Sequence, residues 1–356
     1  MWCRGTRASH QRVWRARGVA PRSELPSTPT TKRSTARLGI DTLESFEADG
    51  DAQWIHIRGV DTSNPVLLLI QQGPGLPMLN EVRRFERLLG LESDFTVVYW
   101  DQRGCGRSLR GNHELADLSV QRMTDDTITL LELLRSRFGT SALVAGFSFG
   151  ATVGAIAAQR RPDLVSTLVA VGMDVDGKAA AANAYEFAAR TANERHNRRA
   201  SRQLKAIGPP PHLTAKQFST RARWAMNFGG VSTKETYGVL VWNLISSLLR
   251  SSDYSLADVP RTLRGITATQ AALLSDLATL DLVVALPRLG VPIVMAQGRH
   301  DQVAPAAAAE RYFGSLDAPS KRLVWFEDSA HTPQLEEPGL FRELLIRIRE
   351  GELAPT

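Results

Sequence analysis

The sequence is poor in cysteine and has no long apolar stretch. Only Cys3 and Cys105 occur among its 356 residues, which is too few for a disulfide framework or for a zinc site built on thiolates. No stretch approaches the roughly 18 apolar residues of a membrane-spanning helix. The chain also lacks G-x-G-x-x-G, a phosphate-loop lysine and H-E-x-x-H. We therefore expect no metal, no cofactor and no membrane partner, and a reducing compartment, the cytoplasm.

Acidic residues are scarce at the N-terminus. Residues 1–37 contain nine Lys and Arg side chains and one acid, so this stretch carries +8 while the whole chain carries +6. The remaining residues, 38–356, therefore carry −2. The basic stretch has no apolar periodicity, which predicts a disordered extension. A nucleic-acid-binding domain would need this charge on its folded surface, so we expect no nucleic-acid partner.

Short apolar runs alternate with helical patterns in residues 38–172 and again in residues 286–356. Uninterrupted runs of this length are typical of strands buried on both faces of a parallel sheet. An alternating pattern around Asp49-Gly50-Asp51 precedes them and predicts an antiparallel hairpin. The alternation predicts an α/β core with a doubly wound, mostly parallel sheet. The runs are residues 65–71, 95–100, 142–147, 166–171, 293–297 and 322–326.

The alternation stops in residues 173–285, where helical patterns follow one another without a strand. A helical block inserted into an α/β chain predicts a cap above the carboxyl edge of the sheet, where open α/β folds bind ligands. Its aromatic residues, among them Trp224 and Trp242, are suited to lining a small apolar pocket. The predicted helices are residues 179–206, 214–227, 234–249 and 267–285.

Residues 146–150 read Gly-Phe-Ser-Phe-Gly and fit the pattern G-x-S-x-G. They follow an apolar run and precede a helical pattern rich in small residues, which is the strand–turn–helix setting of a nucleophile elbow. Glycines are needed there because a Cβ on either side of so tight a turn would clash. The pattern predicts that Ser148 is exposed at the sheet edge as a nucleophile.

A serine nucleophile needs a base and an orienting acid, which follow it along the chain in this architecture. Asp301 and His331 come just past the last two predicted strands, where these two groups belong. We therefore expect His331 to accept the Ser148 proton and Asp301 to hold the imidazole tautomer. His300 cannot easily turn back onto its neighbour Asp301 and also reach the serine. Asp328 is the competing acid, but it is close in sequence to His331.

The backbone should supply the oxyanion hole. One N–H comes from the residue after the nucleophile, Phe149, and the second comes from the loop after the early central strand. Glycine and proline fix an open turn in that loop, and Gly73 is the predicted donor, with Gln72 as the alternative.

Three motifs together resemble the proline iminopeptidase branch of the α/β-hydrolases. They are Gln72-Gly73-Pro74-Gly75, the Asp-Gln-Arg-Gly-Cys-Gly-Arg-Ser of residues 101–108, and the Gly-Phe-Ser-Phe-Gly of residues 146–150. The resemblance covers about residues 38–350. It implies the α/β-hydrolase fold, a Ser–Asp–His hydrolase with a helical cap, and removal of an N-terminal residue, often proline, from small peptides.

The sequence departs from the family pattern in two motifs. The family's His-Gly is Gln71-Gln72 here, and its tryptophan after the nucleophile is Phe149. Family members bind the substrate's free α-amine with cap carboxylates, for which Glu186, Glu194 and Glu235 are candidates by location. In the second motif, Asp101 and Arg103 are expected to tie loops together near the site, and Cys105 to be a small loop residue without an activating partner.

These observations favour a serine hydrolase that forms an acyl-enzyme and acts as a proline-iminopeptidase-like aminopeptidase. The alternative is an esterase, lactonase or thioesterase acting on a small metabolite, because the same triad serves all of these reactions. A non-catalytic binding protein is disfavoured by the presence of every triad residue. The partner is a small molecule or short peptide, and the oligomeric state is not predicted. The candidate substrate-binding residues are Gln72, Glu186, Trp224, Glu235 and Trp242.

Overall fold

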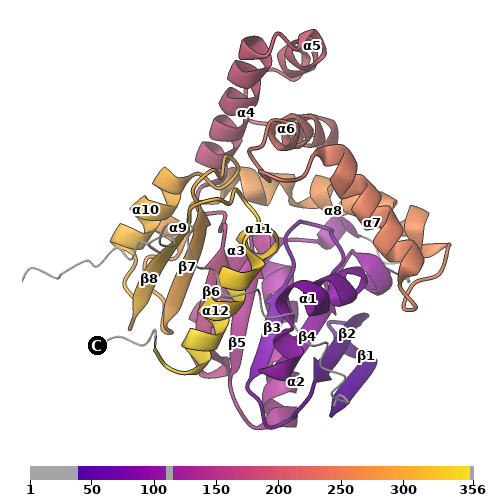
Figure 1. The fold of residues 1–356 in the computed structure, drawn as a ribbon, viewed down its shortest axis with the longest axis vertical. Coiled ribbons are helices and arrows are strands. Elements are labelled where there is room, and N and C mark those ends of the chain that lie inside the picture. Colours follow the sequence, from indigo (N-terminus) through magenta and orange to yellow (C-terminus); the bar gives the residue numbers. More distant parts are fainter. Residues whose placement is uncertain (1–38, 110–114, 353–356) are drawn as a thin grey trace, which may run out of the picture.

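The computed structural model describes residues 39–109 and 115–352 (Figure 1). The predicted basic extension, residues 1–37, lies outside these residues, as does Cys3. The strands are β1 (Ile40–Ala48), β2 (Asp51–Gly59), β3 (Val66–Ile70), β4 (Thr96–Asp101), β5 (Ala142–Phe147), β6 (Val165–Val171), β7 (Ile293–Gly298) and β8 (Lys321–Phe326). The longer helices outside the β6–β7 connection are α1 (Val82–Leu89), α2 (Val120–Phe138), α3 (Phe149–Arg160), α10 (Ala306–Ser315) and α12 (Pro338–Arg349).

The strands form one sheet in the order β1-β2-β4-β3-β5-β6-β7-β8. The β1–β2 and β2–β4 pairs are antiparallel, and the other neighbouring pairs are parallel. The expected doubly wound, mostly parallel sheet is therefore confirmed, as is the early hairpin, whose turn contains Asp49 at a φ of 47° and Gly50 at 76°. The sequence patterns placed the boundaries of the six strands from β3 to β8 within one residue.

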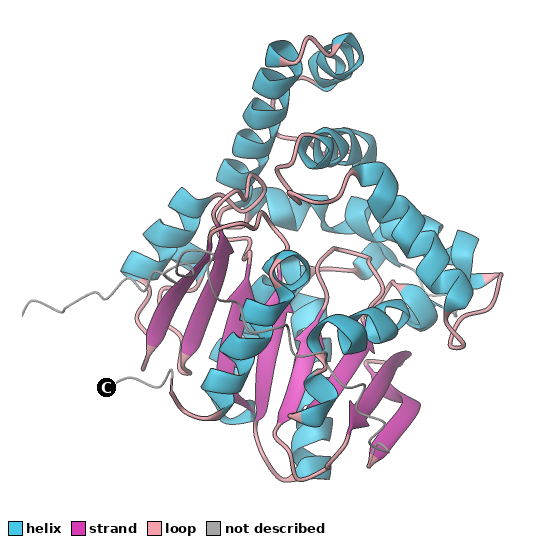
Figure 2. Cartoon of the chain, in the orientation of Figure 1, coloured by secondary structure: helices cyan, strands magenta, loops and turns pink. Residues whose placement is uncertain are grey.

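Helices cover both faces of the sheet (Figure 2). Alternate residues of β3 point to opposite faces. Leu68 and Ile70 belong to one apolar cluster with residues of α2, α3 and α10, while Leu67 and Leu69 belong to another with residues of α1 and α12. All five residues of β3 are buried, which is why this strand reads as a continuous apolar run rather than as an alternating one.

The connection between β6 and β7 is a helical insertion, made of α4 (Gly177–Glu194), α5 (Arg198–Ile207), α6 (Ala215–Asn227), α7 (Tyr237–Arg250), α8 (Asp258–Thr279) and α9 (Leu282–Ala285). It lies against the loops that follow the strands. In α8, Thr269 donates a hydrogen bond to the carbonyl of Gly104 at 3.0 Å, and Gly75 approaches the backbone of Ile266 so closely that a Cβ would lie 2.9 Å from its Cα. The division into core and cap at residues 173 and 285 stays a prediction.

Two of the predicted helices in the insertion have wrong boundaries. The predicted single helix of residues 179–206 is broken where His196 adopts a φ of 50°, and the Asn197 side chain then caps α5 by accepting from the N–H of Ala200 at 3.0 Å. The predicted helix of residues 267–285 begins earlier, at Asp258, because Pro260 is tolerated in the first turn of a helix. It ends at Thr279, and the short helix α9 follows.

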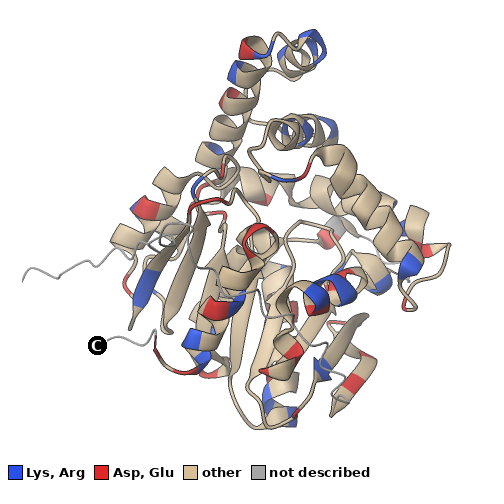
Figure 3. Cartoon of the chain, viewed as in Figure 1, with Lys and Arg blue, Asp and Glu red and all other residues tan. Residues whose placement is uncertain are grey.

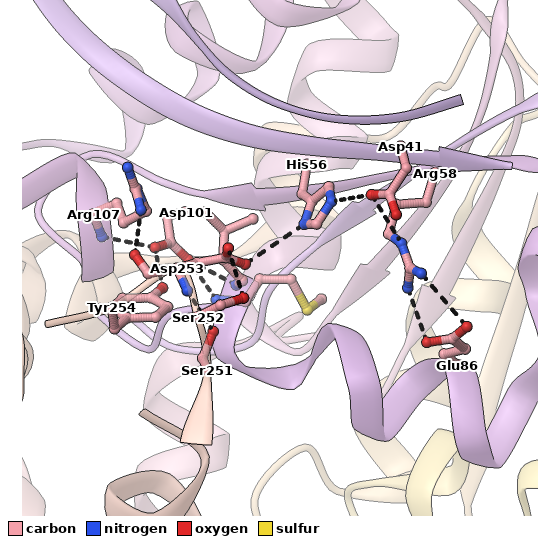
Figure 4. A network of polar contacts seen from close by, with 12 residues as sticks. Asp41, His56, Arg58, Glu86, Asp101, Arg107, Ser251, Ser252, Asp253 and Tyr254 are labelled. Atoms are coloured by element: carbon pink, nitrogen blue, oxygen red, sulfur yellow. Dashed lines mark hydrogen bonds and ion pairs between the residues drawn. The ribbon is translucent and has the colours of Figure 1, made fainter. Parts of the chain in front are cut away.

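The carboxylate of Asp101, at the end of β4, joins three loops. It accepts hydrogen bonds from the backbone N–H groups of Met78 at 2.7 Å, Leu79 at 2.9 Å and Arg107 at 2.8 Å, and from the Tyr254 hydroxyl. Figure 4 shows Arg107 and Tyr254 converging on it. Burial raises the pKa of Asp101, and these donors oppose the rise. Tyr254 belongs to the α7–α8 connection, so this one carboxylate fastens the insertion to the core.

The buried guanidinium of Arg103 joins the early hairpin to α2. It bonds Asp126 through Nε at 2.7 Å and Nη2 at 2.8 Å, donates to the carbonyl of Ala48 at 2.6 Å and pairs with Asp51. The expected structural roles of Asp101 and Arg103 are thus confirmed. Cys105, two residues after Arg103 in the sequence, is buried, and burial raises the pKa of its thiol.

We expect Tyr254→Phe to destabilise the protein by about 1.5–3 kcal/mol, because it removes a hydrogen bond to a buried carboxylate. The measurement is the free energy of unfolding in urea. Tyr185→Phe is the matched control, since the Tyr185 hydroxyl makes only a 3.4 Å contact with the carbonyl of Leu204. Equal losses in the two variants would show that the Asp101 contact is not special.

Candidate active site

Ser148 occupies the turn between β5 and α3 with a φ of 52° and a ψ of −122°. A serine with positive φ is strained and is retained only where the surroundings enforce it. Here the surroundings are close backbone contacts: a Cβ on Gly146 would lie 2.5 Å from the Cα of Ala151, and one on Gly150 would collide with the carbonyl oxygens of Ile70 and Gln71. The predicted tight turn with obligatory glycines is therefore present.

The structure brings Ser148, His331 and Asp301 together from the ends of three strands. The Oγ of Ser148 lies 2.8 Å from Nε2 of His331, and Nδ1 of His331 lies 2.7 Å from Oδ2 of Asp301. All three residues are buried, with exposures of 6%, 7% and 3%, so little bulk water competes for these hydrogen bonds. The prediction that Ser148 is exposed at the sheet edge is therefore wrong, because neighbouring side chains such as His331 and Asp174 pack against it. The arrangement can pass the serine proton to the imidazole while the carboxylate fixes the tautomer.

The carboxylate of Asp301 is itself held in place. Its Oδ1 accepts from the N–H groups of Val303 and Ala304, each at 2.8 Å, and Gln297 donates to its Oδ2 at 3.3 Å. Burial lowers the pKa of His331, but the charge of Asp301 and the hydrogen bond to it outweigh burial and raise that pKa to about 8. The imidazole is thus a stronger base than a free histidine.

The alternative base and acid considered from the sequence do not take part in these hydrogen bonds. His300 and Asp328 are both exposed, and the ring of His331 bonds Asp301 rather than the nearer acid in sequence. The backbone explains this: Asp328 lies on the turn after β8, whereas β7 and β8 run parallel and bring the residues after each strand to the same edge of the sheet.

The loop after β3 contains the candidate oxyanion donors. The N–H of Gln72 donates to Oε1 of Gln71 at 2.8 Å, and Nε2 of Gln71 donates to the carbonyl of Pro77 at 2.8 Å. Gln71, which stands where the family has histidine, therefore braces the loop with its side chain. Among the described residues, no hydrogen bond engages the N–H of Gly73 or of Phe149, so these two amides rather than that of Gln72 are free to bind an anion.

A carboxylate that the sequence reasoning missed lies beside the nucleophile. Oδ2 of Asp174 is 3.4 Å from Oγ of Ser148, and the Asp174 carbonyl accepts from the Thr152 hydroxyl at 2.8 Å. Burial raises the pKa of Asp174 to about 6. A signal for it existed, because Asp174 comes three residues after β6, just as Asp301 and His331 come after β7 and β8.

The candidate acids of the insertion have other surroundings. Glu186 and Glu194 are exposed on α4. Glu235 pairs with Arg84 at 2.9 Å and accepts from Asn243 at 3.3 Å. These observations do not test substrate binding. That each of the three acids binds the substrate amine stays a prediction.

The two candidate tryptophans differ in exposure. Trp224 is 8% exposed, stacks on Phe228 with ring centroids 5.5 Å apart and donates through Nε1 to Gln203 at 2.9 Å, which holds α6 against α5. Trp242 is 65% exposed on α7. Their predicted contacts with substrate also stay untested.

Two further properties concern residues 39–109 and 115–352 as a whole. In that part of the chain, no three His, Cys, Asp or Glu side chains cluster in a way that could hold a metal ion. No helix described there combines the length and the apolar character needed to cross a bilayer.

Comparison with known proteins places this geometry in context. A model of the alpha/beta hydrolase fold matches residues 65–338. The chain is 31% identical over 313 residues to the "Probable aminopeptidase YbaC" of Bacillus subtilis (strain 168), covering 87% of this chain and 97% of the relative.

Two solved structures show the same fold. VinJ has a TM-score of 0.61 at 21% identity, covering 88% of this chain and 99% of VinJ. The proline iminopeptidase of Mycobacterium smegmatis has a TM-score of 0.60 at 19% identity, covering 87% of this chain and 98% of the other. At these identities the likeness concerns the fold alone.

The contacts of His331 predict its titration. We expect an imidazole pKa of about 8, followed by NMR and assigned with a His331→Gln variant. Asp301→Asn should lower this pKa, because it removes the adjacent negative charge. Asp328→Asn is the matched control and should leave the pKa unchanged, since Asp328 is exposed. A fall in the control, with none in Asp301→Asn, would reverse the assignment of the acid.

Proposed function

This chain belongs to the α/β hydrolase family and is a serine hydrolase, and we propose that Ser148, His331 and Asp301 are its catalytic triad. The proposal is supported by the 2.8 Å and 2.7 Å contacts that join the three side chains in the order nucleophile, base and acid. It is also supported by the strained backbone of Ser148, which the close-packed glycines on either side enforce.

In this proposal Oγ of Ser148 attacks the scissile carbonyl carbon while Nε2 of His331 accepts the hydroxyl proton. The N–H groups of Phe149 and Gly73 bind the oxyanion that develops. His331 then donates its proton to the leaving group, and an acyl-enzyme remains on Ser148. A water molecule, activated by the same imidazole, releases the acid and restores the serine.

We further propose that the substrate is an aminoacyl amide or short peptide with a free amine, which makes the protein an aminopeptidase of the proline iminopeptidase type. One observation carries this step: the Asp174 carboxylate lies 3.4 Å from Oγ of Ser148. A negative charge there opposes the oxyanion unless a cation lies beside it. An ammonium group next to the scissile carbonyl supplies that cation. The relative named a probable aminopeptidase agrees with this substrate class.

Ser148→Ala should abolish both turnover and labelling by a fluorophosphonate, with the thermal unfolding temperature unchanged. His331→Ala should cost nearly as much turnover, because the members of a triad act as a unit and their losses do not add. His300→Ala is the matched control and should stay active. An inactive His300→Ala beside an active His331→Ala would overturn the choice of base.

Blocking the substrate amine should weaken transition-state binding by about 2–5 kcal/mol, as expected when one partner of a buried charge pair is removed. The measurement compares kcat/KM for a prolyl arylamide with a free and with an acetylated amine. Asp174→Asn should reduce the difference in kcat/KM between the free and the acetylated arylamide. The control is Asp176→Asn, because asparagine also caps a helix N-terminus as Asp176 caps α4.

Equal rates on the free and the acetylated arylamide would rule out the aminopeptidase and leave the esterase, lactonase or thioesterase alternative. Turnover of acyl esters alone would have the same meaning. Either result leaves the triad proposal standing.

The pH dependence should separate the two parts of the proposal. For a neutral acyl ester, kcat/KM should rise through about pH 8 and then level off, because His331 accepts a proton only when its imidazole is neutral. For an alanyl arylamide the rate should fall again at higher pH, as the substrate ammonium, with a pKa of about 8, loses its charge. It should also fall more steeply below about pH 6, where Asp174 is protonated. Identical profiles for the two substrates would contradict an ammonium site.

A further inference from the structure

The connection between α6 and α7, residues 228–236, is hydrogen bonded to the loops that carry the proposed acid and base. The carbonyl of Gly230 accepts from the N–H of Gln302, the residue after the proposed acid, at 2.9 Å. The carbonyl of Val231 accepts from the N–H of His331 itself, also at 2.9 Å. Gly230 is packed so closely that a Cβ there would lie 2.8 Å from the Cβ of Gln302. The insertion therefore contacts the backbone of both loops.

A buried carboxylate, that of Glu336, completes this contact. Glu336 is 3% exposed and ends the short helix α11 (Pro333–Glu336), and Figure 3 shows acidic residues where α11 meets α12. Its Oε1 accepts from the N–H groups of Ala330 at 3.1 Å and Thr332 at 3.3 Å, and from the Thr332 hydroxyl at 2.9 Å. Its Oε2 accepts from the N–H of Thr233 at 2.7 Å and from the Thr233 hydroxyl at 2.6 Å. One oxygen thus holds the backbone on either side of the proposed base, and the other holds the insertion.

The charge of Glu336 also acts on the imidazole of His331. The donors to the Glu336 carboxylate are neutral N–H and O–H groups, while the ammonium of Lys234 donates to the backbone carbonyl of Glu336. Burial lowers the pKa of His331, and the charges of Asp301, Asp174 and Glu336 raise it. Glu336 is therefore linked to His331 through the backbone, by hydrogen bonds, and through space, by charge.

We propose that Glu336 is a positioning residue for His331, because it ties the backbone around the base to the insertion and so keeps Nε2 within reach of Ser148. This rests on the proposed triad. A general base must lie at hydrogen-bond distance from the group it deprotonates, and a small displacement lowers the rate strongly. A carboxylate suits this position, because it offers two accepting oxygens and a glutamine side chain offers one. The insertion thereby helps to position the base, whichever substrate it selects.

The test measures the rate constant for labelling of Ser148 by a fluorophosphonate, which reports on nucleophile and base without a natural substrate. Glu336→Gln should lower this rate constant by about 10- to 100-fold, because the base loop or the insertion loses its acceptor. The pH midpoint of labelling should also fall below the His331 pKa of about 8, because a nearby negative charge is removed. A purely structural role would reduce only the amplitude of labelling, which counts folded sites, and would leave the rate constant and the midpoint unchanged.

Glu337→Gln is the matched control. Oε2 of Glu337 accepts from the Ser329 hydroxyl at 2.5 Å and from the N–H of Asp328 at 3.2 Å. This variant therefore loosens the same loop without removing a bond to the residues next to His331. It should keep both the rate constant and the pH midpoint of the natural protein.

Thr233→Val tests the insertion side of the contact and takes the place of Glu336→Gln if the latter does not fold. It removes the hydroxyl that donates to Oε2 of Glu336 and keeps the backbone N–H. Labelling should slow by about 3- to 10-fold, the range for one hydrogen bond. Its control is Thr236→Val, because the Thr236 side chain makes no capping hydrogen bond at the start of α7.

An unchanged rate constant in Glu336→Gln, or an equal loss in Glu337→Gln, would overturn the proposal. If labelling is absent from the natural protein, or survives in Ser148→Ala or His331→Ala, the proposed triad fails by itself. The ring-proton NMR signals of His331 then decide. A change in these signals in Glu336→Gln, with none in Glu337→Gln, supports the hold on His331, and unchanged signals in both variants overturn it.

Discussion

The turn at Ser148 is the constraint on which the rest of the site depends. Helix α3 begins so close to the sheet that Gly150 lies against the carbonyl oxygens of Ile70 and Gln71, at the end of β3. The approach that forces Ser148 to positive φ therefore also positions the start of the candidate oxyanion loop. The proposed nucleophile and the candidate oxyanion donors are thus aligned by one packing contact between backbones, which leaves little freedom for either to move alone.

Buried charges, rather than helices, hold the loops around this turn. Asp101 satisfies its carboxylate with three backbone N–H groups and the hydroxyl of Tyr254, and Arg103 satisfies its guanidinium with Asp126, Asp51 and a carbonyl. Leaving a buried charge unpaired costs several kcal/mol. Each loop is therefore held in the position where its donor or acceptor reaches the buried charge. Because Tyr254 belongs to the helical insertion, the same carboxylate also sets how the insertion sits above the site.

Negatively charged groups surround Ser148 and His331. The electrostatics of Asp301 make His331 a stronger base, while Asp174 adds a second negative charge beside the nucleophile. A neutral ester does not need the Asp174 carboxylate, whereas the free amine of the proposed substrate can pair with it. In the proposed function the triad fixes the chemistry, and Asp174, which follows β6, favours a substrate with a free amine.

The sheet, the turn at Ser148, and the meeting of Ser148, Asp301 and His331 could all be predicted from the sequence, because each leaves a local pattern. A buried strand reads as an apolar run, a tight turn needs glycine, and residues just past parallel strands meet at one edge. Asp174 obeyed the same rule and was overlooked. Two contacts could not be predicted and are seen only in the folded chain: Gln71 engages the Gln72 amide, and Glu235 pairs with Arg84. The pair of Glu235 with Arg84 joins segments whose separation along the chain carries no periodic signal, and it depends on how the insertion packs onto the sheet.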